Sequence, residues 1–199
     1  MSIESRKYID LHLAASSQPI ETDQPSSFKK RLWCFVQDWL FRPSPQARFM
    51  WWRRFLLRLF GAEVGQKVQI MPTVRVVCPW NVSIGDRVWI GNFAELYSLE
   101  KIIIEEDAVI SQHVYLCTGT HDYNRLDFPL VAKPIKVEKQ AWLATRSFIA
   151  PGVTIGQGAI VGAQSVVLRD IPPATIYAGN PAIFLKPRPL PAAPSVTKE

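Results

Sequence analysis

An aliphatic residue recurs at every sixth position in the C-terminal half of the chain, at Val137, Leu143, Ile149, Ile155, Val161 and Val167. Four positions after each of them stands a small or β-branched residue, in the order Ala141, Ser147, Val153, Ala159, Ser165 and Ile171. A period of six fits neither the helical repeat nor the alternation of a hairpin strand, so the chain must turn once per repeat and stack on itself. The pattern therefore predicts a parallel β-helix of triangular section.

The same phase is present earlier, from the pair Val64 and Val68 to the pair Ile110 and Val114. Three hexads close one coil. Residues 62–176 are therefore expected to form a solenoid of about five coils around a continuous aliphatic core. Glycines follow at the next corner, at Gly65, Gly85, Gly91, Gly156 and Gly162. A residue without a Cβ suits a corner where the backbone turns sharply or takes a positive φ. The repeat does not determine handedness, although parallel crossovers are normally right-handed.

Two amphipathic helices are expected ahead of the solenoid, in residues 28–61. Ser26 or Ser27 can cap the first, which Pro43 and Pro45 end. Its apolar face comprises Leu32, Phe35, Val36, Trp39 and Leu40. The second is expected over residues 47–60, with Gly61 as its terminator. Its apolar stripe comprises Trp52, Phe55, Leu56 and Leu59, with Arg54 and Arg58 displaced from it.

Two interpretations of these helices stay open. They can cap the open first coil, whose exposed edge and apolar core invite aggregation. Residues 28–60 can instead, or in addition, make peripheral contact with an anionic membrane surface, because the segment is aromatic and basic. Its arginines exclude a bilayer span.

Length and composition support one domain of 199 residues with a polar flexible arm at 1–27 and an extension at 177–199. The formal charge of +6 would suit nucleic acid, a membrane surface or a phosphorylated ligand. No nucleic-acid motif or basic stripe follows the solenoid, so no nucleic-acid partner is expected. The three cysteines have no paired spacing and no secretory signal is apparent, which predicts a cytoplasmic protein, with peripheral contact at the inner face of the membrane as the alternative.

The six-residue phase is lost after Leu116 and resumes at Val137. Residues 117–136 are rich in polar and turn-forming residues and predict a loop extruded from one corner, where functional groups are commonly carried. The loop holds His121, one of three histidines, between Gly119-Thr120 and Asp122-Tyr123. His121 is therefore the candidate catalytic residue.

Five segments resemble the hexapeptide-repeat acyltransferases, in particular the colanic acid and hormogonium polysaccharide biosynthesis acetyltransferases. They are Cys-Pro-Trp-Asn-Val-Ser-Ile-Gly-Asp (78–86), Cys-Thr-Gly-Thr-His-Asp-Tyr (117–123), Phe-Pro-Leu-Val-Ala-Lys-Pro-Ile (128–135), Ala-Pro-Gly-Val-Thr-Ile-Gly (150–156) and Ala-Gly-Asn-Pro-Ala (178–182). The resemblance covers about residues 28–188. The histidine loop joined to Ala-Gly-Asn-Pro-Ala is its most specific part, because carbonic anhydrases and structural domains share the hexads.

The resemblance implies an all-β solenoid, a left-handed parallel β-helix that forms a homotrimer with acetyl-coenzyme A (acetyl-CoA) between neighbouring subunits. The implied reaction is O-acetylation of a sugar hydroxyl in an exopolysaccharide or its precursor, with no metal. A loop histidine is the general base in such enzymes, and His121 matches that position. Neutral imidazole can accept the hydroxyl proton at cytosolic pH. Cys117 offers a covalent alternative, although it is expected to face the coil.

The remaining site residues are expected to position the two substrates. Cofactor-binding candidates are Trp142, Ala144, Gly162, Ala163, Arg169 and Lys186. Backbone amides such as those of Ala144 or Gly162 could donate to the oxyanion, and Arg169, Lys186 and Arg188 could contact phosphates. Trp142 could instead pack at a trimer interface. Acceptor-binding candidates are Asp122, Tyr123, Asn124 and Arg125, although Asp122 could instead cap a turn.

Two other functional classes remain as alternatives. A non-catalytic β-helix scaffold or binding module in polysaccharide assembly is the first. A zinc carbonic-anhydrase-like trimer is the second, and it needs three histidine ligands. His113 and His121 are available for it, whereas His12 lies in the arm.

Overall fold

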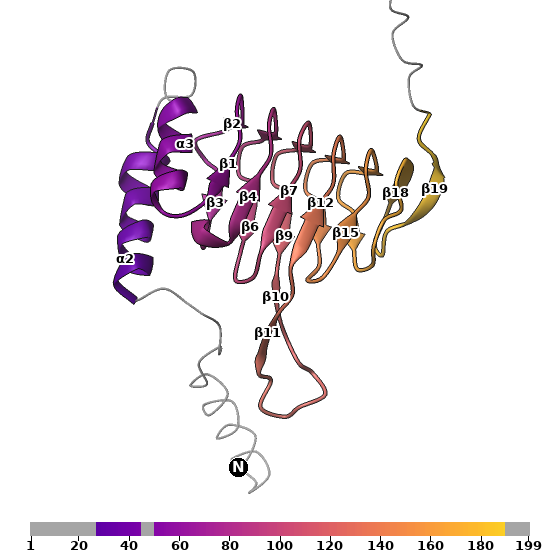
Figure 1. Cartoon of the computed structure of the whole chain (residues 1–199). Helices are drawn as coiled ribbons and strands as arrows, with labels where there is room; N and C mark the ends of the chain where they lie inside the picture. The colour runs from indigo at the N-terminus through magenta and orange to yellow at the C-terminus, as the bar shows by residue number, and fades with distance from the viewer. Residues whose placement is uncertain (1–26, 45–49, 190–199) are drawn as a thin grey trace, which may run out of the picture.

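The computed structural model describes residues 27–44 and 50–189 and shows a parallel β-helix with two helices at one end (Figure 1). Three parallel sheets form its sides. Sheet A comprises β1 (Glu63–Val64), β4 (Val82–Ile84), β7 (Ile102–Ile104), β12 (Ile135–Val137) and β15 (Thr154–Ile155). Sheet C comprises β3 (Arg75–Val76), β6 (Glu95–Tyr97), β9 (Tyr115–Cys117), β14 (Phe148–Ile149) and β17 (Val166–Val167).

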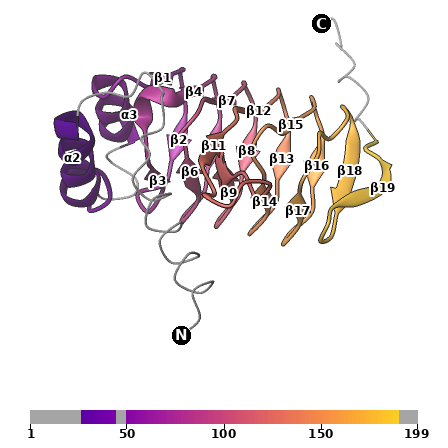
Figure 2. The same ribbon diagram turned by 90° about the horizontal axis from the view of Figure 1, so that it is seen from below.

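Sheet B extends furthest along the solenoid. It comprises β2 (Gln69–Ile70), β5 (Trp89–Ile90), β8 (Val109–Ile110), β13 (Trp142–Leu143), β16 (Ile160–Val161), β18 (Thr175–Ala178) and β19 (Ile183–Pro187). β18 pairs in parallel with β16, and β19 then folds back antiparallel on β18. The described residues therefore form five complete coils. β18 begins a sixth coil, which the antiparallel strand β19 interrupts (Figure 2).

The core confirms both inward positions of the predicted hexad. The six aliphatic residues from Val137 to Val167 are each at most 1% exposed. The small residues four positions later are also buried, from Ala141 at 0% to Ile171 at 3%. Each coil places these pairs over those of the coil before it, so the apolar interior is continuous along the stack.

The corner glycines serve close stacking rather than a positive φ. The glycines with positive φ in the described residues are Gly61, Gly152, Gly158 and Gly179. At Gly85 an added Cβ would lie 2.6 Å from the backbone N of Glu106 in the next coil, and at Gly162 it would lie 2.6 Å from the Cβ of Ala178. Positive φ at the corners falls two residues later, on residues with side chains such as Arg87 and Gln164 and on Gly152 and Gly158.

The first helix is continuous through α2 (Ser27–Val36) and the π-helical turn η1 (Gln37–Phe41), and α3 (Met50–Leu59) is the second. α3 ends at Gly61, as predicted, with φ +97°. Ser26, Pro45 and residues 47–49 lie outside the described residues.

Both helices expose most of their predicted apolar faces, although Val36 and Leu56 are buried. The α2–η1 helix buries Trp33, Val36, Gln37 and Phe41, whereas Phe35 is 59% and Trp39 69% exposed. α3 buries Arg53, Leu56 and Leu57, whereas Leu59 is 65% exposed. The prediction placed the faces of the helices from their apolar residues alone. It did not allow for buried polar side chains whose hydrogen-bond partners lie on the solenoid.

The first coil has no coil before it, so the backbone groups on that edge need other partners. Trp33 Nε1 donates to Val76 O at 2.6 Å, and Gln37 Oε1 accepts from Val76 N at 2.7 Å. Arg53 Nε donates to Ile70 O at 2.7 Å. In the same way Arg54 and Arg58 donate to the carbonyls of Val68 and Val64. Polar side chains of the helices therefore satisfy backbone groups along this edge, from Val64 to Val76.

A matched pair of tryptophans tests this arrangement. Trp33→Phe leaves the buried Val76 carbonyl without its donor, so we expect the free energy of unfolding to fall by about 1–3 kcal/mol. Trp39→Phe removes no described hydrogen bond and is expected to change it by less than about 0.5 kcal/mol. Thermal or denaturant unfolding of both variants measures the difference. Equal destabilisation would contradict the contact between Trp33 and the first coil.

Candidate active site

A β-hairpin projects from the corner between sheets C and A, within the segment predicted as a loop (Figure 1). Its strands β10 (Gly119–His121) and β11 (Leu130–Ala132) pair antiparallel, with His121 opposite Leu130. The stack resumes beyond it, since Ile135 in β12 pairs with Ile102 in β7. The insertion therefore adds a projecting arm without disturbing the coil.

Thr118 holds the base of the hairpin, and the sequence analysis did not identify it. Its side chain is fully buried, and Oγ1 donates to Tyr97 O at 2.7 Å and accepts from Glu100 N at 3.0 Å. Its carbonyl accepts from Lys133 N at 2.9 Å, which closes the stem. These bonds join the outgoing and returning strands to the preceding coil. His121 is thus carried on a fixed stem.

His121 lies at the end of β10, and its imidazole is exposed. Nδ1 lies 2.6 Å from the carbonyl oxygen of Phe128 on the returning side of the hairpin. A carbonyl oxygen can only accept, so Nδ1 must carry the proton and Nε2 must carry the lone pair when the ring is neutral. This is the tautomer that a general base requires.

The other loop candidates make contacts within the hairpin. Asp122 Oδ1 accepts from the backbone N of Asn124 at 3.0 Å and from its Nδ2 at 3.1 Å, so Asp122 caps a turn. Arg125 makes a bidentate ion pair with Asp127, at 3.0 and 2.7 Å, and this pair holds the pKa of the Asp127 carboxyl below its usual range. Tyr123 is 83% exposed and projects from the tip. These residues shape the end of the arm beside His121.

Cys117 is 8% exposed, and its thiol donates to Gly119 O at 3.2 Å. A buried thiol engaged in this way is not presented to a substrate. The covalent alternative therefore has no geometric support.

Most of the predicted cofactor residues lie on and beside sheet B, whereas Arg169 follows β17 of sheet C. Trp142 in β13 projects outward and is 43% exposed, with Nε1 donating to Ser111 Oγ at 2.9 Å. Ala144 and Gly162 follow β13 and β16, at equivalent corners of successive coils.

The amides of Ala144 and Gly162 cannot serve as the predicted oxyanion donors. Ala144 N donates to Val161 O at 2.9 Å, and Gly162 N donates to Tyr177 O at 2.8 Å, so the coil ladder uses both. The next residues differ: within the described residues the backbone N–H groups of Thr145 and Ala163 have no hydrogen-bond acceptor. Thr145 is a candidate that the sequence analysis missed, because only the coil geometry reveals which amides are used.

A cleft of about 510 Å³ lies between the last coil and the β18–β19 ribbon, and Arg169, Tyr177 and Phe184 are among its lining residues. Arg169 and Lys186 are both exposed. Arg188 is instead committed to the fold, because Nη1 donates to Gly158 O at 2.8 Å and to Gln140 O at 3.1 Å. The structure thus leaves Arg169 and Lys186, but not Arg188, accessible to an anionic ligand.

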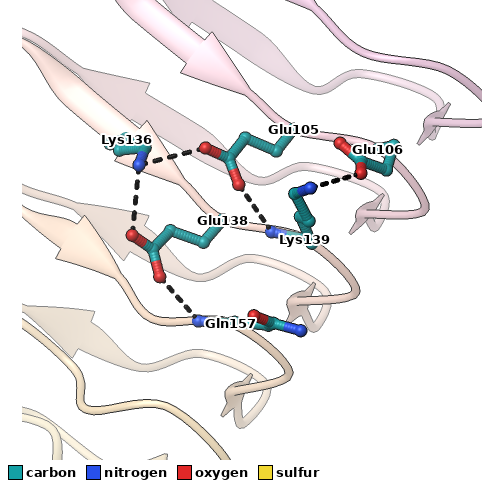
Figure 3. A network of polar contacts seen from close by, with 6 residues as sticks. All are labelled: Glu105, Glu106, Lys136, Glu138, Lys139 and Gln157. Carbon is teal, nitrogen blue, oxygen red and sulfur yellow. Dashed lines mark hydrogen bonds and ion pairs between the residues drawn. The ribbon is translucent and has the colours of Figure 1, made fainter.

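An ionic network on sheet A joins the strand after the hairpin to its two neighbours (Figure 3). Lys136 Nζ contacts Glu105 at 3.0 Å and Glu138 at 3.1 Å, and Lys139 Nζ contacts Glu106 at 2.7 Å. Glu138 also accepts from Gln157 N in the following coil at 2.9 Å. Lys136 lowers the pKa of the Glu138 carboxyl, and Glu105 and Glu138 raise the pKa of Lys136. The network fastens the return of the hairpin to the stack.

No group of three or more metal-ligating side chains occurs in the part of the chain that the structure describes. His113 lies on a coil corner with its ring stacked on Phe93, 4.9 Å between centroids, and His12 lies outside the described residues. The same residues contain no helix long and apolar enough to cross a membrane.

Comparison with known proteins defines the class. No protein-family model matches the chain. A protein of Escherichia coli K12, named for an acetyltransferase role in colanic acid biosynthesis (WcaF), is 45% identical over 163 residues, 82% of this chain and 89% of the relative. The chain therefore belongs to the family of hexapeptide-repeat acetyltransferases that includes this relative.

Solved structures share the left-handed β-helix fold. A maltose O-acetyltransferase of Clostridium difficile 630 is 26% identical with a TM-score of 0.69, over 82% of this chain and 88% of that one. A hexapeptide-repeat acetyltransferase of Vibrio cholerae, solved with acetyl-CoA, has a TM-score of 0.75 at 24% identity, over 94% of this chain and 98% of that one. These likenesses confirm the predicted fold and its handedness.

The sheet A network makes a prediction about pH. A carboxyl whose pKa is lowered by folding contributes stability above its unfolded pKa, about 4.3 for Glu, and loses it as the pH falls through the folded pKa. Lys136→Met is therefore expected to lower the melting temperature by a few degrees at pH 7 and to have less effect at pH 3, because the Glu138 carboxyl gains protons as the pH falls through its lowered pKa. Differential scanning fluorimetry at both pH values measures this.

Lys133→Met is the matched control, because Lys133 is exposed and makes no ion pair within the described residues. A Lys136→Met effect that persists unchanged at pH 3, or that Lys133→Met reproduces, would show that the network is not responsible.

Proposed function

We propose that the protein is an acetyl-CoA-dependent O-acetyltransferase that acts on a sugar hydroxyl of an exopolysaccharide or its precursor, with His121 as general base. The observation that carries the proposal is the contact between Nδ1 and Phe128 O, which leaves Nε2 as the acceptor on an exposed ring. The relative named for colanic acid biosynthesis supports the acceptor class, and the acetyl-CoA complex of the Vibrio cholerae protein supports the donor.

The reaction is a direct transfer. Nε2 of His121 takes the proton from the acceptor hydroxyl while its oxygen attacks the thioester carbonyl carbon, which gives a tetrahedral oxyanion. The oxyanion collapses, the C–S bond breaks, and the leaving thiolate receives the proton from Nε2. Nδ1 keeps its proton throughout, and Phe128 O stabilises the positive charge that the ring carries between the two transfers.

The oxyanion needs a donor that the fold does not already use. The amides of Thr145 and Ala163 meet that condition, one residue beyond the corners first considered. Thr145 lies three residues after Trp142, at the corner that follows β13, so an acyl chain that follows sheet B would pass both. Arg169 and Lys186 would then meet the phosphates of CoA toward the last coil.

A homotrimer completes this site. After Gln69 in β2, the outward residues of sheet B form an apolar ladder of Trp89, Val109, Trp142, Ile160 and Ile176, paired strand to strand. Sheet A presents Glu63, Ser83, Ile103, Lys136 and Thr154 at its outward positions, of which Ile103 is apolar. Sheet C presents Arg75 and Glu95 before Tyr115, Phe148 and Val166, so sheet B carries the longest run of apolar outward residues. Such a run favours association through that side. His121 projects from the opposite corner, so neighbouring copies would bring the hairpin of one to sheet B of the next, with one site per interface.

The two exposed histidines give a matched test of the base. His121→Ala removes the only group assigned to proton transfer, so kcat for acceptor-dependent CoA release is expected to fall about 10²-fold or more. His113→Ala is expected to stay within about threefold of wild type, because His113 lies on a coil corner outside the hairpin. Release from acetyl-CoA is measured across sugar, nucleotide-sugar and polysaccharide acceptors. Equal rates in wild type and His121→Ala would remove His121 from the mechanism.

Association through sheet B is tested by charge insertion. Ile160→Lys places an ammonium in the apolar ladder and is expected to shift the protein from three chain masses to one in light scattering, with loss of activity. Ser83→Lys makes the same change on the outward face of sheet A and is expected to leave the mass unchanged. A wild-type monomer, or an Ile160→Lys trimer of unchanged stability, would contradict the proposed interface.

A further inference from the structure

The helices carry a second apolar surface, far from the hairpin. Phe28, Leu32, Phe35 and Trp39 are all exposed and follow one another at helical spacing along α2 and η1, from 41% at Leu32 to 73% at Phe28. On α3 the corresponding exposed stripe is Trp51, Phe55 and Leu59, at 58%, 46% and 65%. We call these seven residues the helical surface.

A hydrogen bond from Trp52 joins the two helices, and aromatic contacts follow each stripe. The rings of Phe35 and Trp39 stack with centroids 6.2 Å apart. Trp52 bridges the helices, because its Nε1 donates to Leu40 O at 3.2 Å and its ring stacks on Phe55 at 5.6 Å. Trp51 meets the ring of Trp52 at 5.8 Å. The helical surface is therefore one patch that spans both helices.

The contacts with the first coil do not account for this patch. The helices meet that coil with their other faces, through Trp33, Gln37 and Arg53. The exposed stripes thus lie on the side turned away from the coil, at the end of the β-helix opposite β18 and β19 (Figure 1, Figure 2). A patch of large aromatic side chains in such a position marks an interaction site.

The charge of the segment identifies the kind of partner. Residues 27–60 contain eight Lys and Arg residues and one acidic residue, Asp38, for a net charge of +7, whereas the remaining residues of the chain have a net charge of −1. Arg53, Arg54 and Arg58 bind carbonyls of the first coil. Arg31 and Arg42 are exposed on the first helical segment, where Arg42 also contacts Asp38 at 3.5 Å. Exposed aromatic and aliphatic side chains flanked by basic residues are complementary to the interface of an anionic bilayer, where rings insert at headgroup depth and cations meet phosphates.

We propose that the helical surface docks the protein on an anionic membrane surface, without crossing it. The partner is the headgroup region of the bilayer, which accommodates apolar rings and attracts the basic residues beside them. In the trimer proposed above, three helical surfaces would lie at the same end of the assembly and bind together, which raises the apparent affinity without new contacts. Membrane docking would place the active sites beside a lipid-linked acceptor, although the docking surface stands independently of the acceptor's identity.

Vesicle co-sedimentation tests the proposal with the full chain. Wild type is expected to sediment with vesicles that contain phosphatidylglycerol, to bind phosphatidylcholine vesicles far less, and to be released by added salt. Phe35→Ser/Trp39→Ser is expected to weaken binding to the anionic vesicles about tenfold or more, and Arg31→Glu is expected to weaken it as well. Phe93→Ser is the matched control, because Phe93 is 53% exposed on a coil corner and is expected to leave binding unchanged.

Three results would overturn the proposal. They are no sedimentation of wild type with the anionic vesicles, equal binding to neutral vesicles, or a changed mass of Phe35→Ser/Trp39→Ser in light scattering, which would mean that another copy covers the surface. CoA release with a water-soluble acceptor is expected to match wild type in this variant. That readout separates failure of membrane docking from failure of the proposed transfer reaction.

Discussion

The close stacking of one coil on the next is the constraint on which the rest of this structure depends. Successive coils approach until an added Cβ at Gly85 or Gly162 would lie 2.6 Å from the neighbouring coil. At that spacing the backbone ladder is continuous and the inward residues of each hexad form one dry core. The same regularity leaves two places for function, since only an insertion at a corner or a residue on an outward face can vary without disturbing the stack.

The hairpin uses the first of these places. Its stem leaves after β9 and returns to β12 in register, held by Thr118 and by the ionic contacts of Lys136. In the proposed reaction a rigid stem keeps Nε2 close to the acceptor hydroxyl and then to the leaving thiolate. The contact of His121 with Phe128 O then sets the tautomer. The outward faces of the sheets are the second place where function can vary. Sheet B carries the apolar ladder, and sheet A carries the ionic network.

Much of the solenoid could be predicted from the sequence because a six-residue repeat reports directly on which side chains face inward. The buried faces of the helices could not be predicted in this way. Trp33, Gln37 and Arg53 are buried there, and their hydrogen-bond partners lie on a coil edge that is distant in sequence. The pattern of apolar residues therefore indicated the face of each helix that is mostly exposed, and not the face that meets the coil. Such nonlocal partners have no local signature in the sequence.

The candidate site was predicted in part. His121 could be identified from the break in the repeat, but β10 and β11 are too short to show a strand pattern. The oxyanion donor depends on which amides the ladder already uses, so the sequence indicated Ala144 and Gly162, whereas Thr145 and Ala163 are the ones left without an acceptor.

The most direct test of the account is the tautomer of His121 by ¹⁵N NMR of histidine-labelled protein, with His121→Ala to assign the signals. At a pH where the ring is neutral, the account predicts that Nδ1 carries the proton and that Nε2 shows the chemical shift of an unprotonated nitrogen. A proton on Nε2, or rapid exchange between the two tautomers, would contradict the role of Phe128 O and with it the assignment of His121 as a preset base.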